Sequence, residues 1–268
     1  MGSFRSSLTR LARRPAVSQA PTYDGPTRVL AILGMHRSGT SSLAGSLEAS
    51  GLDIGAVDTG NQWNEKGNRE SHVLMRIHDD VLINSGGSWS SVPEHITWTA
   101  ATRKRLERFI ESRSKVPLWG FKDPRTILVI EHWLEVLPDL EMVATFRHPA
   151  AVARSLARRH GSDSPERWLS VWLDYSKPLL ELCESRYVPL IDFGQPIDQY
   201  QQRLKDLITE LRLPAPEAGN AFFDGSLRTP GAPKEMELPA EVERTHQRLV
   251  EIAADQTGAS RVTTATTT

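Results

Sequence analysis

The chain of 268 residues has one cysteine, no long apolar run and almost no net charge. Its single cysteine, Cys183, excludes an intrachain disulfide, and the leucines around it favour core packing over a nucleophile. A chain without a disulfide framework fits a reducing compartment, so we expect a cytoplasmic protein. Apolar runs such as VLAIL, Val29 to Leu33, have the length of a strand and not the roughly 20 residues of a membrane span.

The formal net charge of −1 argues against a general nucleic-acid binder. The hydrophobic fraction of 39% and the charged fraction of 24% are those of an ordinary soluble protein. Because net charge averages over the whole surface, a local basic pocket for an anion remains compatible with this composition.

A lysine is also missing from a familiar pattern. In GMHRSGTSSL, Gly34 is followed after four residues by Gly39, which nearly gives the phosphate-binding loop G-x-x-x-x-G-K-[ST]. Thr40 stands where that loop has its lysine, and Arg37 lies inside the loop instead. The pattern therefore indicates an anion site but disfavours the triphosphate of ATP or GTP.

Both ends of the sequence differ in composition from its middle. Residues 1–20 are rich in Arg and Ser and lack acids, as in a transit peptide, and Gly2 with Ser6 matches the myristoylation pattern. We favour a disordered tail over 1–26. A single α/β domain is expected over 27–230, and a polar C-terminal extension over 231–268.

Apolar and β-branched segments alternate with segments of helical spacing. Four strands are expected, at 28–34, 117–121, 140–146 and 187–193. Helices are expected through Leu43 to Gly51, at 73–81, 106–110 and 124–137, after Pro149, from Ser164, and at 196–211. This order predicts one α/β domain, with a mostly parallel sheet flanked by helices, similar to the fold of P-loop nucleoside-triphosphate hydrolases.

In such sheets ligands bind where strands give way to helices. The segments to inspect are therefore GMHRSGT, KDPR, RHP and DFG, which follow the four expected strands. In the first of these, free N–H groups and the dipole of the next helix favour an anion. Ser38, Thr40 and Ser41 add hydroxyl donors, and Arg37 adds a charge and a planar fork of donors.

The segment RSGTSSL resembles the 5′-phosphosulfate-binding loop of sulfotransferases that use 3′-phosphoadenosine 5′-phosphosulfate (PAPS). A second segment, VATFRHPAAVARSL, resembles the 3′-phosphate-binding segment of that superfamily, with Arg147, Pro149 and Ser155 in its characteristic places. Arg147 leaves a strand at the expected ligand edge, and Ser155 lies in the helix that follows. The two segments in this order make the resemblance stronger than either alone.

Two further segments resemble bacterial members of the superfamily: NEKGNRE, Asn64 to Glu70, and WGFKDPRT, Trp119 to Thr126. Many members have aromatic residues before the final Glu of the first segment, where this chain has Asn68 and Arg69. The ordered resemblance runs from about Arg28 to Phe193. The later segment FFDGSLRTP is weakly similar to the last basic segment of the superfamily, with Arg228 as its basic residue.

The resemblance implies transfer of a sulfuryl group from PAPS to a hydroxyl or amine of a small-molecule, glycan or lipid acceptor. It implies no metal requirement, because side-chain cations occupy the site. Catalytic roles fall to Glu70, Lys122 and Arg37. The residues implied in binding the nucleotide are Arg37, Ser38, Gly39, Thr40, Ser41, Arg147 and Ser155.

The acceptor must lose a proton, so a base within hydrogen-bond reach is expected. Glu70 is the first candidate and Glu65 the second, with His72 or His95 next if neither serves. Asp123 is also explained as a helix cap. Arg125 is left to pair with an acid or with an anionic ligand.

Two alternatives belong to other classes. A P-loop kinase or nucleotide hydrolase is supported by the strand that ends in Asp192, whose carboxylate is suited to Mg²⁺. A non-catalytic nucleotide-binding module is supported by the missing aromatic residues before Glu70. His72 and His78 show no paired metal-ligand spacing and are interpreted as ordinary helix residues.

Overall fold

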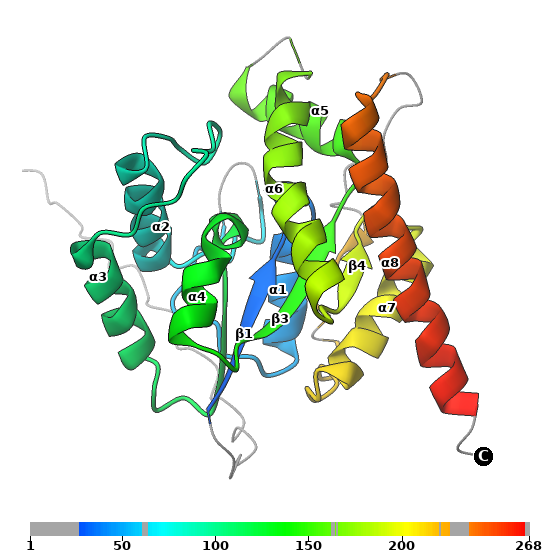
Figure 1. Cartoon of the computed structure of the whole chain (residues 1–268). Coiled ribbons are helices and arrows are strands. Elements are labelled where there is room, and N and C mark those ends of the chain that lie inside the picture. Colours follow the sequence, from blue (N-terminus) through cyan, green and yellow to red (C-terminus); the bar gives the residue numbers. More distant parts are fainter. Residues whose placement is uncertain are drawn as a thin grey trace, which may run out of the picture.

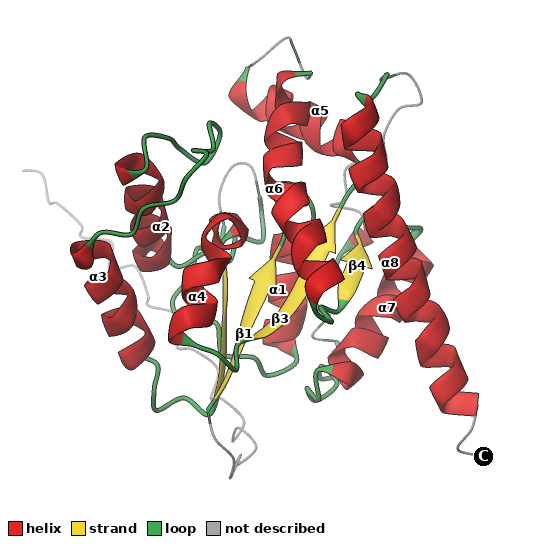
Figure 2. Ribbon diagram, in the orientation of Figure 1, coloured by secondary structure: helices red, strands yellow, loops and turns green. Residues whose placement is uncertain are grey.

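The computed structural model describes residues 27–60, 64–161, 164, 166–219, 221–225 and 236–265. A four-stranded parallel sheet lies at its centre, in the order β2-β1-β3-β4 (Figures 1 and 2). The strands span Arg28–Leu33 (β1), Leu118–Lys122 (β2), Glu141–Phe146 (β3) and Leu190–Asp192 (β4). Because all four run parallel, their carboxyl ends meet at one edge of the sheet.

Helices follow or connect the strands along the described chain. They span Thr40–Ala49 (α1), His72–Asn84 (α2), Ala100–Glu111 (α3), the 3₁₀ helix Pro124–Val129 (η1), Ile130–Val136 (α4), Pro149–His160 (α5), Arg167–Ser185 (α6), Ile197–Glu210 (α7) and Ala240–Ala265 (α8). Several starts carry the expected signals. Asp123 caps η1 by accepting a hydrogen bond from the N–H of Arg125, and Pro124 is the first residue of that helix. Pro149 is likewise the first residue of α5.

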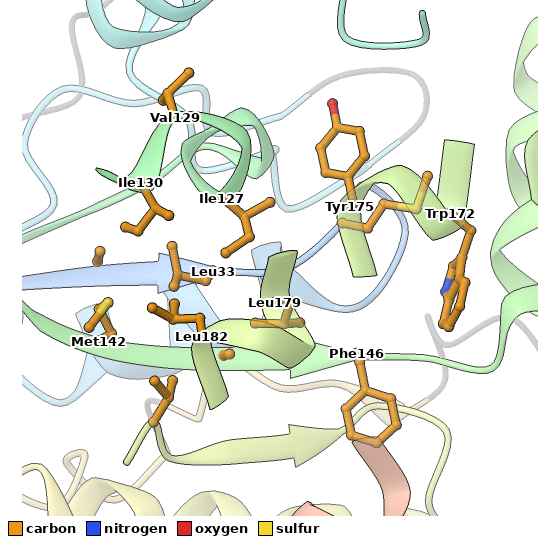
Figure 3. Close-up of a cluster of buried hydrophobic side chains, with 14 of the residues drawn as sticks. Leu33, Ile127, Val129, Ile130, Met142, Phe146, Trp172, Tyr175, Leu179 and Leu182 are labelled. Atoms are coloured by element: carbon orange, nitrogen blue, oxygen red, sulfur yellow. The ribbon is translucent and has the colours of Figure 1, made fainter. Parts of the chain in front are cut away.

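The side chains of β1 alternate between two apolar cores. Val29, Ala31 and Leu33 join the larger core with residues of α2, α4, α5, α6 and α8, part of which is drawn in Figure 3. Leu30 and Ile32 join the smaller core with residues of α1 and α7. The sheet is therefore covered on both faces, and the predicted α/β fold class is confirmed.

Three elements differ in extent from their sequence patterns. The expected helix over 124–137 divides into η1 and α4, since Val129 leaves the helical conformation at φ −124°. The strand expected at 187–193 is paired only over the three residues of β4. The helix expected from Ser164 begins at Arg167.

Residues 231–268, expected as a polar extension, contain α8. This helix packs along α6 and β4 at the right of Figure 1 and buries Val242, Leu249 and Ala253. Full burial of one leucine contributes about 1.5–3 kcal/mol, so the helix adds to the main core. Residues 1–26 and Arg228 lie outside the described residues.

Cys183 packs against the larger core from a half-buried position, as expected. Burial raises the pKa of its thiol to about 12, which makes it a poor nucleophile near neutral pH. In the described part of the chain, every helix is too short or too polar to cross a membrane.

Candidate active site

The loop between β1 and α1 needs glycine at both of its ends. Gly34 has a φ of 134°, and a Cβ there would lie 2.2 Å from the carbonyl oxygen of Thr145 in β3. Gly39 has a φ of 88°, and a Cβ there would lie 2.3 Å from the ring of Phe193. Only glycine therefore fits where the loop passes close to β3 and to the turn after β4.

In the described part of the chain, the first turn of α1 has no side-chain cap. Gly39 occupies the cap position and has no side chain to accept a hydrogen bond from the first turn. Ser38 is buried, and its hydroxyl has no partner among the described residues. Backbone N–H groups, the helix dipole and this hydroxyl together favour an anion at the start of α1.

Arg37 joins the two segments that the sequence predicts as phosphate sites. Its Nε donates to the Ser155 hydroxyl at 2.9 Å, and its carbonyl accepts from Nη1 of Arg147 at 3.4 Å. Arg37 also has a φ of 66°, a left-handed conformation that costs a non-glycine residue about 1–3 kcal/mol. Such strain is retained mainly at functional sites, and here it directs the side chain toward α5.

Contacts of Arg147 and of the residue that follows it fix the end of β3. The Arg147 carbonyl accepts a hydrogen bond from Nε1 of Trp172 at 3.2 Å. The ring of the next residue, His148, accepts from the N–H of Ala150 at 3.3 Å and so caps α5. The guanidinium carbon lies 5.5 Å from the centre of the Phe193 ring, which also packs against Gly39. The loop and Arg147 therefore share one aromatic support.

Positive charge accumulates around Arg37. Burial lowers the pKa of its guanidinium, and the neighbouring charges of Arg159 and Arg158 lower it further. No acid in the described ranges forms an ion pair with Arg37. An anion bound beside these arginines would relieve their mutual repulsion.

Lys122 and Glu70 form a buried ion pair. The Lys122 Nζ donates to Oε1 of Glu70 at 2.5 Å, and the two side chains are only 1% and 8% exposed. Lys122 ends β2 at the ligand edge, while Glu70 ends the segment NEKGNRE. The expected cation and the expected base are therefore direct neighbours. Glu65, the second candidate base, is exposed.

The residues that replace the expected aromatics hold NEKGNRE against α1. The carbonyl of Asn68 accepts a hydrogen bond from the Ser41 hydroxyl at 3.0 Å. Arg69 pairs with Glu48 of α1 at 2.8 Å and stacks 4.7 Å from the centre of the Phe222 ring. The Arg69 side chain therefore has its own contacts with Glu48 and Phe222, whereas Asn68 contributes its main-chain carbonyl. The Ser41 hydroxyl is thus engaged with protein.

Asp123 belongs to a separate cluster that is linked internally, which we call the closed cluster: Asp79, His78, Asp123, Arg125 and Trp133. Asp123 accepts from Arg125 at 2.9 Å and faces Nδ1 of His78 at 3.0 Å, while Nε2 of His78 accepts from Trp133 at 3.0 Å. Arg125 also pairs with Asp79 at 2.6 Å. Arg125 thus pairs with acids, and His78, interpreted from sequence as an ordinary helix residue, is a fully buried member of this cluster. Its hydrogen-bond partners could not be predicted from helical spacing.

Although the burial of Asp123 opposes its ionisation, its hydrogen bond from His78 and the charge of Arg125 hold its pKa well below the usual range. The same acid raises the pKa of Arg125, against the effect of burial. Both groups are therefore charged throughout the physiological pH range, and they form an ion pair with each other.

His36 is a residue of this region to which the sequence analysis gave no role. Its Nε2 is buried without a partner among the described residues, and its ring lies 4.9 Å from Trp89 and 5.8 Å from Tyr175, measured between centres. Burial lowers its pKa well below the ordinary value, and the charges of Arg125 and Lys122 act in the same direction. In the sequence, the position of His36 directly before Arg37 in the loop could have indicated that it belongs to the site.

Within the described ranges, no group of three or more His, Cys, Asp or Glu side chains is arranged to hold a metal ion. Asp192, the carboxylate of the kinase alternative, accepts a hydrogen bond from the N–H of Gly194 at 2.5 Å within its own turn.

No protein-family model matches the chain, and no curated protein matches it in sequence. Among solved structures, it is similar to the sulfotransferase domain of the Synechococcus PCC 7002 olefin synthase. That likeness has 17% identity and a TM-score of 0.49, and covers 89% of this chain and 98% of that one. It is also similar to sulfotransferase STF1 from Mycobacterium tuberculosis H37Rv, at 12% identity and a TM-score of 0.44 over 84% and 77% of the two chains. Both TM-scores lie below 0.5, so the functional assignment below depends on the residues of this chain.

Proposed function

We propose that the chain is a sulfotransferase that moves the sulfuryl group of PAPS to a hydroxyl or amine of an acceptor. The observation that carries this proposal is the contact of Arg37 with both Ser155 and Arg147. It joins the loop that resembles a 5′-phosphosulfate site to the segment that resembles a 3′-phosphate site. A nucleotide with anionic groups at both ends fits such a pair of sites.

The polar groups of this region suit PAPS as a co-substrate. The start of α1 offers N–H groups and the unpartnered Ser38 hydroxyl for the 5′ side. Arg147 and Ser155 would hold the 3′-phosphate. Arg37, between them, would face the 5′-phosphosulfate while keeping its contact with Ser155.

PAPS supplies an activated sulfuryl group, and an in-line displacement transfers it, so the protein has mainly to position groups and stabilise charge. Charge grows on the departing phosphate, where fixed cations lower the barrier. Arg37 and Lys122 take this role. Lys122 has further N–H donors beside the one directed at Glu70, so it can serve both groups.

Glu70 is assigned as the base that takes the acceptor's proton. Its Oε1 receives the hydrogen bond of Lys122, which leaves Oε2 for the acceptor. Attack, proton removal and departure of the phosphate are then organised around one buried ion pair.

A thermal-shift comparison tests the cofactor. We expect stabilisation by 3′-phosphoadenosine 5′-phosphate (PAP) without Mg²⁺, and less by ATP or GTP, because the loop lacks the lysine of the triphosphate site. Transfer from labelled PAPS to a panel of alcohols, phenols, glycans and lipids would then identify the acceptor. Mg²⁺-dependent stabilisation by ATP with none by PAP would instead indicate a kinase or a nucleotide hydrolase.

A further inference from the structure

Five side chains from four segments lie beside Arg37. We call them the Trp89 corner: His36, Trp89, Arg159, His160 and Trp168. The Trp89 ring centre lies 4.9 Å from that of His36, 5.4 Å from that of His160 and 5.9 Å from that of Trp168, with which it stacks. The Tyr175 hydroxyl donates to the Trp89 carbonyl at 2.8 Å and fixes this part of the α2–α3 loop.

Arg159 places the corner next to the proposed transfer site. It lies one helical turn after Ser155 on α5, so the two side chains share a face of that helix. Ser155 is the residue that holds Arg37. Burial lowers the pKa of both His36 and His160, and the nearby charge of Arg159 lowers both further.

The arginines of this region exceed its acids. Neither Arg158 nor Arg159 forms an ion pair among the described residues, while Arg167 stacks 5.3 Å from the ring centre of Trp168. Glu166 is an acid at the start of α6, where Arg154 and Ser164 lower its pKa after the stronger effect of its own backbone N–H. The proposed 3′-phosphate site uses Arg147 and Ser155, so Arg158 and Arg159 are additional cations.

The Trp89 corner also contains two buried ring nitrogens. Nε2 of His36 and Nε1 of Trp168 have no hydrogen-bond partner within the described ranges. An indole N–H can only donate, so its missing partner is a hydrogen-bond acceptor. Buried polar atoms of this kind are uncommon in proteins and point to a ligand or water.

We propose that the Trp89 corner binds the sulfuryl acceptor, and that this acceptor carries both a ring and an anionic group. Trp89 is partly exposed and has one face stacked on Trp168, so the rest of its ring can contact a sugar or aromatic ring. Arg158 and Arg159 offer planar donors for a carboxylate, phosphate or sulfate. This inference rests on the proposed function. The charge of Lys122, the ion-pair partner of Glu70, acts on His36 and so connects the corner with the proposed base.

The test uses the full chain saturated with PAP and two probes that differ in one charged group: p-nitrophenyl β-D-glucuronide and p-nitrophenyl β-D-glucoside. Titration calorimetry should show the glucuronide binding at least about tenfold more tightly, as expected for a charge-assisted hydrogen bond. In the R158Q/R159Q variant this preference should fall to about twofold or less. The variant R244Q/R248Q changes net charge equally on exposed α8 and should keep the preference.

Trp89→Ala should weaken both probes by a similar factor, and Trp89→Phe should restore most of the loss, because a ring face is the shared contact. Equal binding of the two probes, binding of neither, or displacement of PAP by either would overturn the inference. So would a preference that survives R158Q/R159Q. If the unaltered chain fails to bind PAP, the proposed function itself fails, and that result is visible before any probe is added.

Discussion

Two polar clusters lie at the same edge of the sheet and differ in how their charges are paired. In the closed cluster, Asp123, Arg125 and Asp79 pair with one another, and Trp133 satisfies His78. In the second, which we call the open cluster, Arg37 has no acid partner among the described residues, and the hydroxyl of Ser38 has no hydrogen bond there. Their neighbours Arg147 and Ser155 are counted with the open cluster, although both have hydrogen-bond partners within the protein.

This difference distinguishes groups that stabilise the fold from groups that are available to bind a ligand. A buried charge that is paired within the protein is already compensated, so a ligand gains little by approaching it. Cations and donors without internal partners favour an anion from outside. The clusters are connected through Lys122 and Glu70, which pair with each other. The charge of Glu70 acts on Arg125 of the closed cluster, and Asn68, two residues before Glu70, contacts Ser41 near the open cluster. The predictions below test this distinction.

The largest effect is expected at that junction. Glu70→Gln removes the proposed base while keeping size and polarity, so turnover should fall by about 10²–10⁴-fold while PAP affinity barely changes. The acid limb of the pH–rate profile should disappear with it. Turnover measured with labelled PAPS and a saturating acceptor checks this.

Glu65→Gln is the matched control, because Glu65 is exposed and should retain most activity. If Glu65→Gln carries the loss, the segment is right and the residue wrong. Normal turnover in both variants would move the base elsewhere, and His72, His95 or His36 would be examined next.

The next largest effect is expected on the free energy of unfolding, which should respond differently to substitutions in the two clusters. Asp123→Ala leaves Arg125 and His78 without their shared partner and should cost about 3–5 kcal/mol of unfolding free energy. Ser38→Ala removes a hydroxyl that has no partner among the described residues, so stability should change by less than about 0.5 kcal/mol. Urea unfolding of the two variants measures this, and similar losses in both would abolish the distinction between the clusters.

The strands and the loop could be predicted from sequence because they depend on local patterns. Apolar runs mark the strands, and Gly34 and Gly39 mark the turns around Arg37. The parallel order then places Lys122 and Arg147 at one edge of the sheet. Local pattern could also identify Asp123 as a cap, because its partner lies two residues away.

The remainder depended on contacts between distant residues. Helix α8 has few apolar positions, and only packing on α6 shows that Leu249 is buried. The contact between Arg37 and Ser155 spans 118 residues, and that between Glu70 and Lys122 spans 52. No spacing rule reaches across such separations, so sequence could propose these residues but not their pairing.

Within the open cluster, Arg147→Ala should weaken PAP binding by about 1.5–3 kcal/mol, the range for a charge-assisted hydrogen bond. The loss should be much smaller for adenosine 5′-monophosphate, which lacks the 3′-phosphate and therefore the proposed partner. Titration calorimetry with both nucleotides measures this, with Arg244→Ala on exposed α8 as the control. Equal losses for the two nucleotides would place Arg147 away from the 3′-phosphate.

The smallest expected effect is on the stability of the protein at acidic pH, and it arises at His246 beside the open cluster. Burial lowers the pKa of His246 on α8 from 6.5 to about 4, and His148, whose ring centre lies 4.8 Å away, adds to this. Between these two pKa values the unfolded chain binds more protons than the folded one. The contribution of neutral His246 is therefore complete above about pH 6.5 and is lost as the pH falls toward 4.

The pKa of Asp123 in the closed cluster lies well below this window, so Asp123 keeps its charge throughout it. His246→Phe preserves an aromatic ring against Phe146 and Trp172 but cannot be protonated. Its urea midpoint should therefore fall less between pH 7 and pH 4.5 than that of the unaltered protein. His72→Phe, on the exposed side of α2, should leave the slope unchanged. If His246→Phe keeps the full slope, the acid sensitivity does not arise at the contact between α8 and the end of β3.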